Sequence, residues 1–146
     1  LTSVTTLAGG KGVNVSAAVR RAGRPTLAIL PADPDDPIAE ALRLRDVPAQ
    51  LVPVGHRART NMKIVQPDGT TTEFNEPGEH LTPENVSALV SALMADCPGS
   101  TWLCLCGSLP PGAPVDWYVR LVTMAREVGV QVVVDVESRA AAAATP

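Results

Sequence analysis

The chain of 146 residues, 45% of them hydrophobic, is long enough to bury the core of one globular domain. Its formal net charge of −3 provides no general attraction for nucleic acid or an anionic membrane, and no apolar run approaches the roughly 20 residues of a membrane span. We therefore expect a cytoplasmic protein without a nucleic-acid or membrane partner. Leu1 and the alanine run AAAAATP at 140–146 lead us to expect a chain that is incomplete at both ends.

A glycine-rich turn, AGGKGVN at residues 8–14, opens the chain. It is not a nucleotide-binding P-loop, because Lys11 is followed by glycine, and it lacks the third glycine of a dinucleotide-binding fingerprint. Apolar residues at helical spacing follow from Val15 to Ala22, and Gly23 stands where a helix commonly ends. The pattern predicts a turn that directs backbone N–H groups and the Lys11 ammonium toward an anion.

The next segments predict a strand at 26–30, a loop at 31–37 and a helix at 38–44. Three short extended runs follow at 51–54, 59–66 and 70–75, and the turn-forming residues 67–69 join the last two into an antiparallel hairpin. Alternation along the second run places Arg59, Asn61 and Lys63 on one face of the hairpin. The opposite face carries Met62 and Ile64.

The last part of the chain has the pattern of a βαβ unit. Thr82 and Pro83 are typical of a helix N-terminus, and the elements after that helix are a strand at 101–106, the loop GSLPPG at 107–112, a helix at 115–128 and a strand at 130–136. In open parallel sheets ligands bind beyond the carboxyl ends of the strands. The loop and Asp135 both fall there, so we expect them to meet the glycine turn at one cleft.

The cysteines and histidines carry no metal-binding pattern. Cys97, Cys104 and Cys106 have no CxxC spacing, and we expect all three to be inert thiols of the core. His56 and His80 lie in polar stretches and are expected to be ordinary surface residues.

Four collinear motifs carry a family likeness: AGGKGVNVSAAVRRAG, RTNMKIVQPDGTTTEFNEPG, CGSLPPG and VVVDV. In this order and spacing the chain resembles the PfkB/ribokinase family of carbohydrate kinases, most of all the branch that phosphorylates sugar phosphates such as fructose 1-phosphate. The resemblance implies an α/β fold, a Rossmann-like αβα sandwich with a small β-sheet lid. One partial kinase domain over 1–146 is then expected, with lid strands near 1–8 and 51–76 and an α/β core from 9–50 and 81–146.

The resemblance also implies roles for individual residues. In the family the glycine turn holds the sugar hydroxyls, and an arginine on the lid strand contacts the phosphate that the substrate already carries. These roles fall here on the turn and on Arg59. The loop after the 101–106 strand is either a rigid connector or a pocket wall, and Gly107 and Ser108 contact the substrate in the second case. The expected substrate-binding residues are Gly9, Gly10, Lys11, Asn14, Arg59, Asn61, Gly107 and Ser108.

The implied reaction converts ATP and fructose 1-phosphate into ADP and fructose 1,6-bisphosphate with Mg²⁺. The family's catalytic aspartate belongs to a G-A-G-D motif that the sequence lacks, so no catalytic residue is expected in this chain, which alone should turn over little or no substrate. Tagatose 6-phosphate or fructose 6-phosphate is the alternative substrate. Two non-catalytic functions also fit the sequence: a module that binds sugar phosphate, and a structural remnant whose lid face forms a dimer. A homodimer through the lid is also expected for the complete protein.

Some residues keep two interpretations. Asp135 is either a general base or holds the loop after its strand through hydrogen bonds to backbone amides, and it is not assigned the catalytic role. Asn14 either binds sugar or caps the helix. Asp33 and Ser138 stand where the family usually has glycine, and these departures affect the expected loop shapes.

Overall fold

The computed structural model describes residues 3–135. Helix α1 spans Lys11–Arg21, α2 Pro37–Leu44, α3 Pro83–Asp96 and α4 Trp117–Glu127. The strands are β1 Ala28–Pro31, β2 Ala49–Val52, β3 Asn61–Val65, β4 Thr71–Asn75, β5 Trp102–Cys106 and β6 Gln131–Asp135. Val136 and Ser138, named from the sequence, lie outside the described residues.

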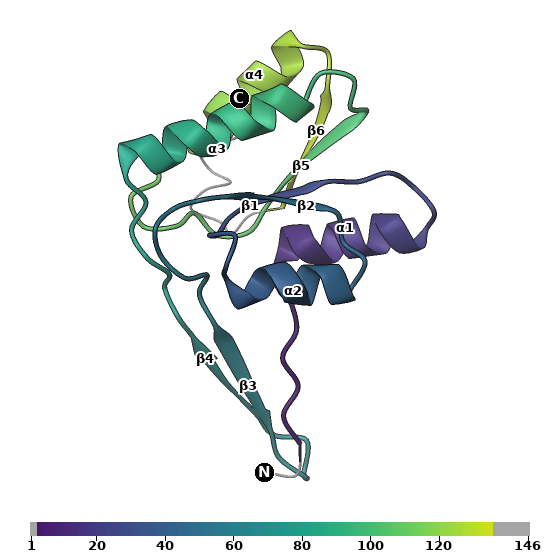
Figure 1. The fold of residues 1–146 in the computed structure, drawn as a ribbon, viewed down its shortest axis with the longest axis vertical. Coiled ribbons are helices and arrows are strands. Elements are labelled where there is room, and N and C mark those ends of the chain that lie inside the picture. Colours follow the sequence, from purple (N-terminus) through teal and green to yellow (C-terminus); the bar gives the residue numbers. More distant parts are fainter. Residues whose placement is uncertain (1–2, 136–146) are drawn as a thin grey trace.

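Parallel strand pairs form the centre of the fold. Strand β1 pairs in parallel with β2, and β5 pairs in parallel with β6. Helices α3 and α4 lie on one side of the strands and α1 and α2 on the other, as Figure 1 shows. Helix α1 contacts both β1 and β5, so it joins the two strand pairs. The arrangement confirms the expected αβα layers.

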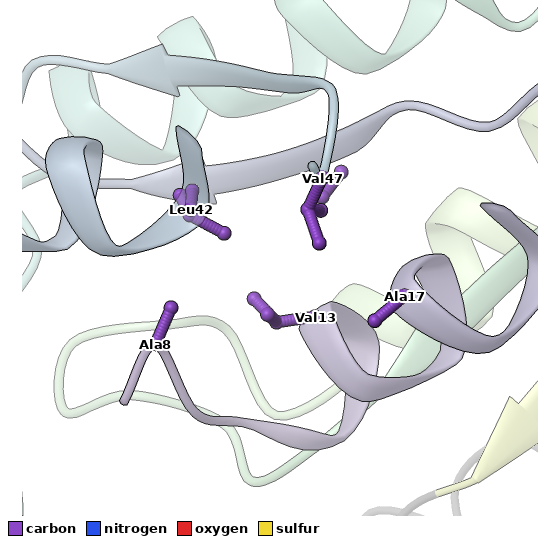
Figure 2. Close-up of a cluster of buried hydrophobic side chains, with 6 residues drawn as sticks. Ala8, Val13, Ala17, Leu42 and Val47 are labelled. Carbon is purple, nitrogen blue, oxygen red and sulfur yellow. The ribbon is translucent and has the colours of Figure 1, made fainter. Parts of the chain in front are cut away.

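The packing between α1 and α2 forms one of the buried clusters. Its buried members include Val13, Leu42 and Val47, and their side chains gather between the two helices in Figure 2. On α1 the buried residues are Val13, Ser16 and Ala17. Of the apolar residues at helical spacing in this stretch, Val15 and Val19 are half-buried, whereas Ala18 and Ala22 are exposed.

The predicted capping of α3 is confirmed in atomic detail. Asn85 donates its backbone N–H to the Thr82 hydroxyl at 3.2 Å, and Thr82 donates its own N–H to the Asn85 side chain at 3.0 Å. Pro83 occupies the first turn, where its missing N–H costs no helical hydrogen bond. Leu89 is buried against β2 residue Val52, so the helix covers that face of the sheet.

Two expected strand boundaries are different in the structure. The run from Leu51 belongs to β2, whose pairing with β1 is parallel, and not to the antiparallel hairpin. Val47 before β2 and Val54 after it are both buried, which favours a place in the core for this segment. Residues 3–8 are in no strand, although Ala8 at the end of the run is buried. Strands β3 and β4 form the predicted hairpin, which extends away from the layers in Figure 1.

Candidate active site

The glycine turn leads directly into α1. Gly10 is the N-cap residue, with a φ of 103° that favours glycine, and no side chain caps this end of the helix. Asn14 donates its backbone N–H to the Gly10 carbonyl at 3.0 Å, which closes the first helical turn. The N–H groups ahead of Asn14 have no intrahelical acceptor by geometry, and they face the region before the helix. This is the arrangement that the sequence predicted.

Lys11 joins the turn to the end of the last described strand. Its Nζ lies 3.0 Å from Asp135 Oδ1. The backbone carbonyl of Asp135 accepts a hydrogen bond from the Gly107 N–H at 3.0 Å, and the Tyr118 hydroxyl donates to the Gly107 carbonyl at 3.0 Å. The glycine turn, the loop after β5 and the end of β6 therefore meet, as expected for the carboxyl ends of parallel strands.

Arg59 lies just before β3, on a segment that two carboxylates hold. The N–H of Ala58 donates to Asp36 Oδ2 at 2.7 Å, and the N–H of Thr60 donates to Glu76 Oε2 at 2.7 Å. Arg59 is exposed and makes no ion pair among residues 3–135. A guanidinium in this state keeps its paired N–H groups available for an oxyanion.

A small pocket brings the hairpin and the loop after β5 together. It has a volume of about 440 Å³ and is lined by Arg59, Asn61, Asn75, Glu76, Pro77 and Ser108. Arg59 and Ser108 are 49 residues apart in the sequence, so the fold creates this neighbourhood. A wider open cavity of about 2470 Å³ is lined by Gly9, Gly10, Lys11 and Gly107 as well as by Arg59, Asn61 and Ser108.

Asn14 is placed apart from the other seven expected residues. Its side-chain oxygen accepts hydrogen bonds from both terminal nitrogens of Arg45 at 3.3 Å, and it does not line the wide cavity. Arg45 also donates to the Ala8 carbonyl, so it ties the start of α1 to the end of α2. In this arrangement Asn14 holds the glycine turn to α2.

Several side chains differ from their expected surroundings. Cys97 is buried, but Cys104 is exposed and Cys106 is only half-buried, so the expected burial of all three thiols is corrected. His56 is half-buried, and its Nε2 atom is buried without a hydrogen-bond partner among the described residues. Lys63 forms an ion pair of 2.6 Å with Glu73, its cross-strand neighbour, so part of the cationic face is neutralised.

Burial, nearby charges and hydrogen bonds shift the pKa of two groups near the site, Cys106 and Asp33. Burial, followed by the neighbouring Cys104 and Asp135, raises the pKa of the Cys106 thiol, and Lys11 opposes this change. Hydrogen bonds from the N–H groups of Gly55 and Val54 lower the pKa of Asp33. The Asp33 carboxylate thus holds the segment 54–55 in the same way as Asp36 holds Ala58.

Sequence reasoning missed Asp36 and Glu76. The order Asp36-Pro37 ahead of an apolar helix is a helix-start signal and could have identified the capping role. Nothing in the local pattern indicates that the second oxygen of the same carboxylate reaches residue 58.

Within residues 3–135 there is no group of three or more His, Cys, Asp or Glu side chains that could hold a metal ion. In the same residues no helix is both long and apolar enough to cross a membrane.

The fold and the site define an open α/β protein with a lysine and an arginine gathered near the carboxyl ends of its parallel strands. The model of the pfkB family carbohydrate kinases matches residues 1–145, and the chain belongs to this family. A 1-phosphofructokinase of Rhodobacter capsulatus is 33% identical over 134 residues, which are 88% of this chain and 42% of the relative. A 1-phosphofructokinase of Xanthomonas campestris pv. campestris is 32% identical over 99% of this chain and 47% of the relative.

Solved structures share the fold at similar identity. The tetrameric inhibited form of phosphofructokinase-2 from Escherichia coli matches with a TM-score of 0.84 and 29% identity, over 93% of this chain and 45% of that chain. A possible 1-phosphofructokinase from Thermotoga maritima matches with a TM-score of 0.85 and 28% identity, over 99% of this chain and 48% of that chain. The chain thus spans about half the length of these relatives.

Proposed function

We propose that the protein that carries this chain transfers a phosphoryl group from ATP to a sugar phosphate, with fructose 1-phosphate as the substrate and fructose 1,6-bisphosphate as the product. Membership of the pfkB family supports the reaction class. Two relatives named 1-phosphofructokinase, each above 30% identity, support the choice of substrate. A cytoplasmic location belongs to the same proposal and rests on this metabolic role.

The observation that carries the proposal is the pocket shared by Arg59, Asn61 and Ser108. Its volume of about 440 Å³ is within the range of small-molecule sites. Arg59 supplies a planar pair of donors that match two phosphate oxygens. In our proposal Arg59 binds the phosphate already present on the sugar, and Asn61 and Ser108 supply further hydrogen bonds. An unphosphorylated sugar would leave the guanidinium without its anion.

The glycine turn provides the second part of the proposed site. Gly9 and Gly10 let a ligand approach the backbone closely, and we assign the sugar hydroxyls to this position. Lys11 is bound to Asp135 through one contact, and an ammonium has three N–H donors, so two remain for the substrate. Gly107 lines the same wide cavity as the turn, and in our proposal it forms part of the pocket wall. For Asn14 to contact the sugar, a bound substrate must draw its side chain away from Arg45.

Phosphoryl transfer depends mostly on positioning and on neutralising charge, and the residues of this chain perform those tasks on the acceptor side. They orient the sugar through hydrogen bonds and balance its phosphate with the Arg59 guanidinium. ATP and Mg²⁺ supply the transferred group and its charge neutralisation in the complete enzyme, and this part of the proposal rests on the family alone.

Fructose 6-phosphate is the second candidate substrate. The ATP-dependent 6-phosphofructokinase isozyme 2 of Escherichia coli is 29% identical to this chain. A solved structure of phosphofructokinase-2 from Escherichia coli, in complex with fructose-6-phosphate, matches with a TM-score of 0.83. Both sugar phosphates suit an arginine-lined pocket, and the position of the phosphate on the sugar separates them.

A steady-state kinase assay of the protein that carries this chain tests the proposal. We expect the highest kcat/KM with fructose 1-phosphate, lower values with fructose 6-phosphate and tagatose 6-phosphate, and very little activity with fructose. Arg59→Ala should lower kcat/KM for the sugar phosphate by about a hundredfold, since a charge-assisted bidentate contact is lost. Arg57→Ala is the matched control, because it removes the same charge two residues away and does not line the small pocket.

We also propose that the complete protein forms a homodimer through the apolar face of the hairpin. Met62 and Phe74 are cross-strand partners on that face, and both side chains are more than half exposed. Exposed apolar patches of this kind commonly become covered in an assembly. The Escherichia coli relative is described as tetrameric in its inhibited form, which supports self-association in the family.

A further inference from the structure

Asp36 connects two segments that lie far apart in the sequence. It is 8% exposed, and it is one of two buried polar side chains among the described residues. Its Oδ1 accepts the N–H of Ile38 at 2.8 Å and thereby caps α2. Its Oδ2 accepts the N–H of Ala58 at 2.7 Å. The two oxygens of one carboxylate therefore fix the segment before β3 to the start of a core helix.

Arg59 is the residue that this connection positions. Ala58 directly precedes it, and the N–H of the following residue, Thr60, is held by Glu76 at 2.7 Å. The Arg59 side chain lies over Gly78, where an added Cβ would be 3.6 Å from Arg59 Cδ. The backbone on both sides of Arg59 is thus anchored, whereas its side chain is exposed. Because the backbone at Arg59 is already anchored, ligand binding has to remove less conformational freedom from the Arg59 side chain.

We propose that Asp36 is a positioning residue for Arg59 and that it determines how strongly the site prefers a phosphorylated sugar over an unphosphorylated one. This inference rests on the proposed function, because it takes Arg59 as the phosphate contact. Asp36 does not touch the substrate. It holds the peptide next to Arg59, so its removal lets the guanidinium move away from the phosphate position without changing the charge of Arg59.

Asp33 provides a matched control on the same loop. Its Oδ1 accepts both the Val54 N–H at 2.8 Å and the Gly55 N–H at 3.0 Å. Asparagine at position 33 keeps one oxygen and can therefore accept both bonds. Asparagine at position 36 has one oxygen for two N–H groups at different atoms, and its NH₂ group cannot accept the second. Both substitutions remove the same charge, but only the one at 36 leaves an N–H group, that of Ala58 or that of Ile38, without its acceptor.

The test is a titration of the protein that carries this chain with fructose 1-phosphate, fructose 6-phosphate and fructose. We expect Asp36→Asn to weaken binding of the preferred sugar phosphate about tenfold, the effect of losing one well-placed charged hydrogen bond, and to leave the affinity for fructose unchanged. Asp33→Asn should change neither affinity by more than about twofold. In an Arg59→Ala background, Asp36→Asn should not weaken binding of the sugar phosphate further, because the Arg59 contact that Asp36 positions is already lost.

The outcomes separate this inference from the function on which it rests. If the unmodified protein binds no sugar phosphate better than fructose, the proposed function fails and the inference fails with it. If that preference exists but Asp36→Asn weakens all ligands equally, or adds to Arg59→Ala, the function stands and the inference is overturned. Asp36→Ser keeps a capping oxygen for α2 but is too short to reach Ala58, so it releases Ala58 specifically. It must show the same loss of sugar-phosphate affinity that is expected of Asp36→Asn, and an Asp36→Ser variant that keeps full affinity overturns the inference.

Discussion

The Nζ atom of Lys11 and the Oδ1 atom of Asp135 lie 3.0 Å apart and connect the first turn of α1 to the last residue of β6. Both side chains are about half exposed. Ion pairs in such surroundings contribute little to stability, typically about 1 kcal/mol or less. The main effect of Asp135 is therefore to position two groups. Its carboxylate keeps the Lys11 ammonium beside the glycine turn, and its backbone carbonyl accepts a hydrogen bond from the Gly107 N–H.

Replacing Lys11 with methionine should separate binding from stability. We expect the affinity for the sugar phosphate to fall about tenfold, because a charged donor to the substrate is lost. The free energy of unfolding should change by less than about 1 kcal/mol. Titration and urea unfolding measure the two quantities. Asp135→Asn breaks the same ion pair but keeps the Lys11 charge, so a tenfold loss of affinity in that variant as well would assign the effect to the pair and not to the lysine.

The reactivity of Cys106 should report the same pair of charges. Burial, Cys104 and Asp135 raise the pKa of its thiol, so alkylation at pH 8 is expected to be slow and to accelerate as the pH rises toward that pKa. Asp135→Asn removes a raising influence and should increase the rate, whereas Lys11→Met removes the lowering influence and should decrease it. Mass spectrometry of iodoacetamide-treated protein follows the rate at Cys106. Equal rates in the two variants would contradict the assigned cause.

The cluster between α1 and α2 should carry a substantial part of the stability. Leu42 is 2% exposed, and Leu42→Ala is expected to lower the free energy of unfolding by about 2–5 kcal/mol through lost burial and the cavity left behind. Leu44, on the same helix, is 73% exposed, and Leu44→Ala should change it by no more than about 0.5 kcal/mol. Chemical denaturation compares the two. Similar values for both variants would show that α2 does not pack as described.

The hairpin should control self-association through one of its two faces. Phe74→Lys places a charge on the apolar face and should convert the proposed dimer into a monomer. Thr71 lies on the same strand three residues away and alternates to the other face, so Thr71→Lys should leave the dimer intact. Sedimentation velocity distinguishes the species. A dimer that survives Phe74→Lys would place the interface elsewhere.

Local sequence signals are sufficient to predict several elements of the fold. Thr82, Pro83 and the apolar spacing after them predicted α3, because capping and helical periodicity depend on neighbours only a few residues away. The parallel pairing of β5 and β6 also followed, since a helix between two strands leaves few other arrangements. The resemblance to the kinase family identified Arg59, Asn61 and Ser108, which one pocket then brought together.

The remaining features depend on contacts between distant segments. The Asp36 carboxylate reaches Ala58 across 22 residues, and neither segment carries a signal for the other. The run from Leu51 reads as an extended segment in either setting, so only its pairing with β1 assigned it to the core. Cys104 was expected to be buried from its apolar neighbours, but burial depends on what covers a strand face. Asparagine can cap a helix, bind a sugar or accept hydrogen bonds from an arginine, and the residues around Asn14 do not distinguish among these three roles.

The preference for a phosphorylated substrate is the central claim, and calorimetric titration of Arg59→Ala beside the unmodified protein and Arg57→Ala tests it most directly. The ligands are fructose 1-phosphate, fructose 6-phosphate and fructose. Our account predicts that one sugar phosphate binds well above fructose in the unmodified protein and in Arg57→Ala, and that the preference disappears in Arg59→Ala. Folded protein that binds all three ligands equally, or an Arg59→Ala variant that keeps the preference, would contradict it.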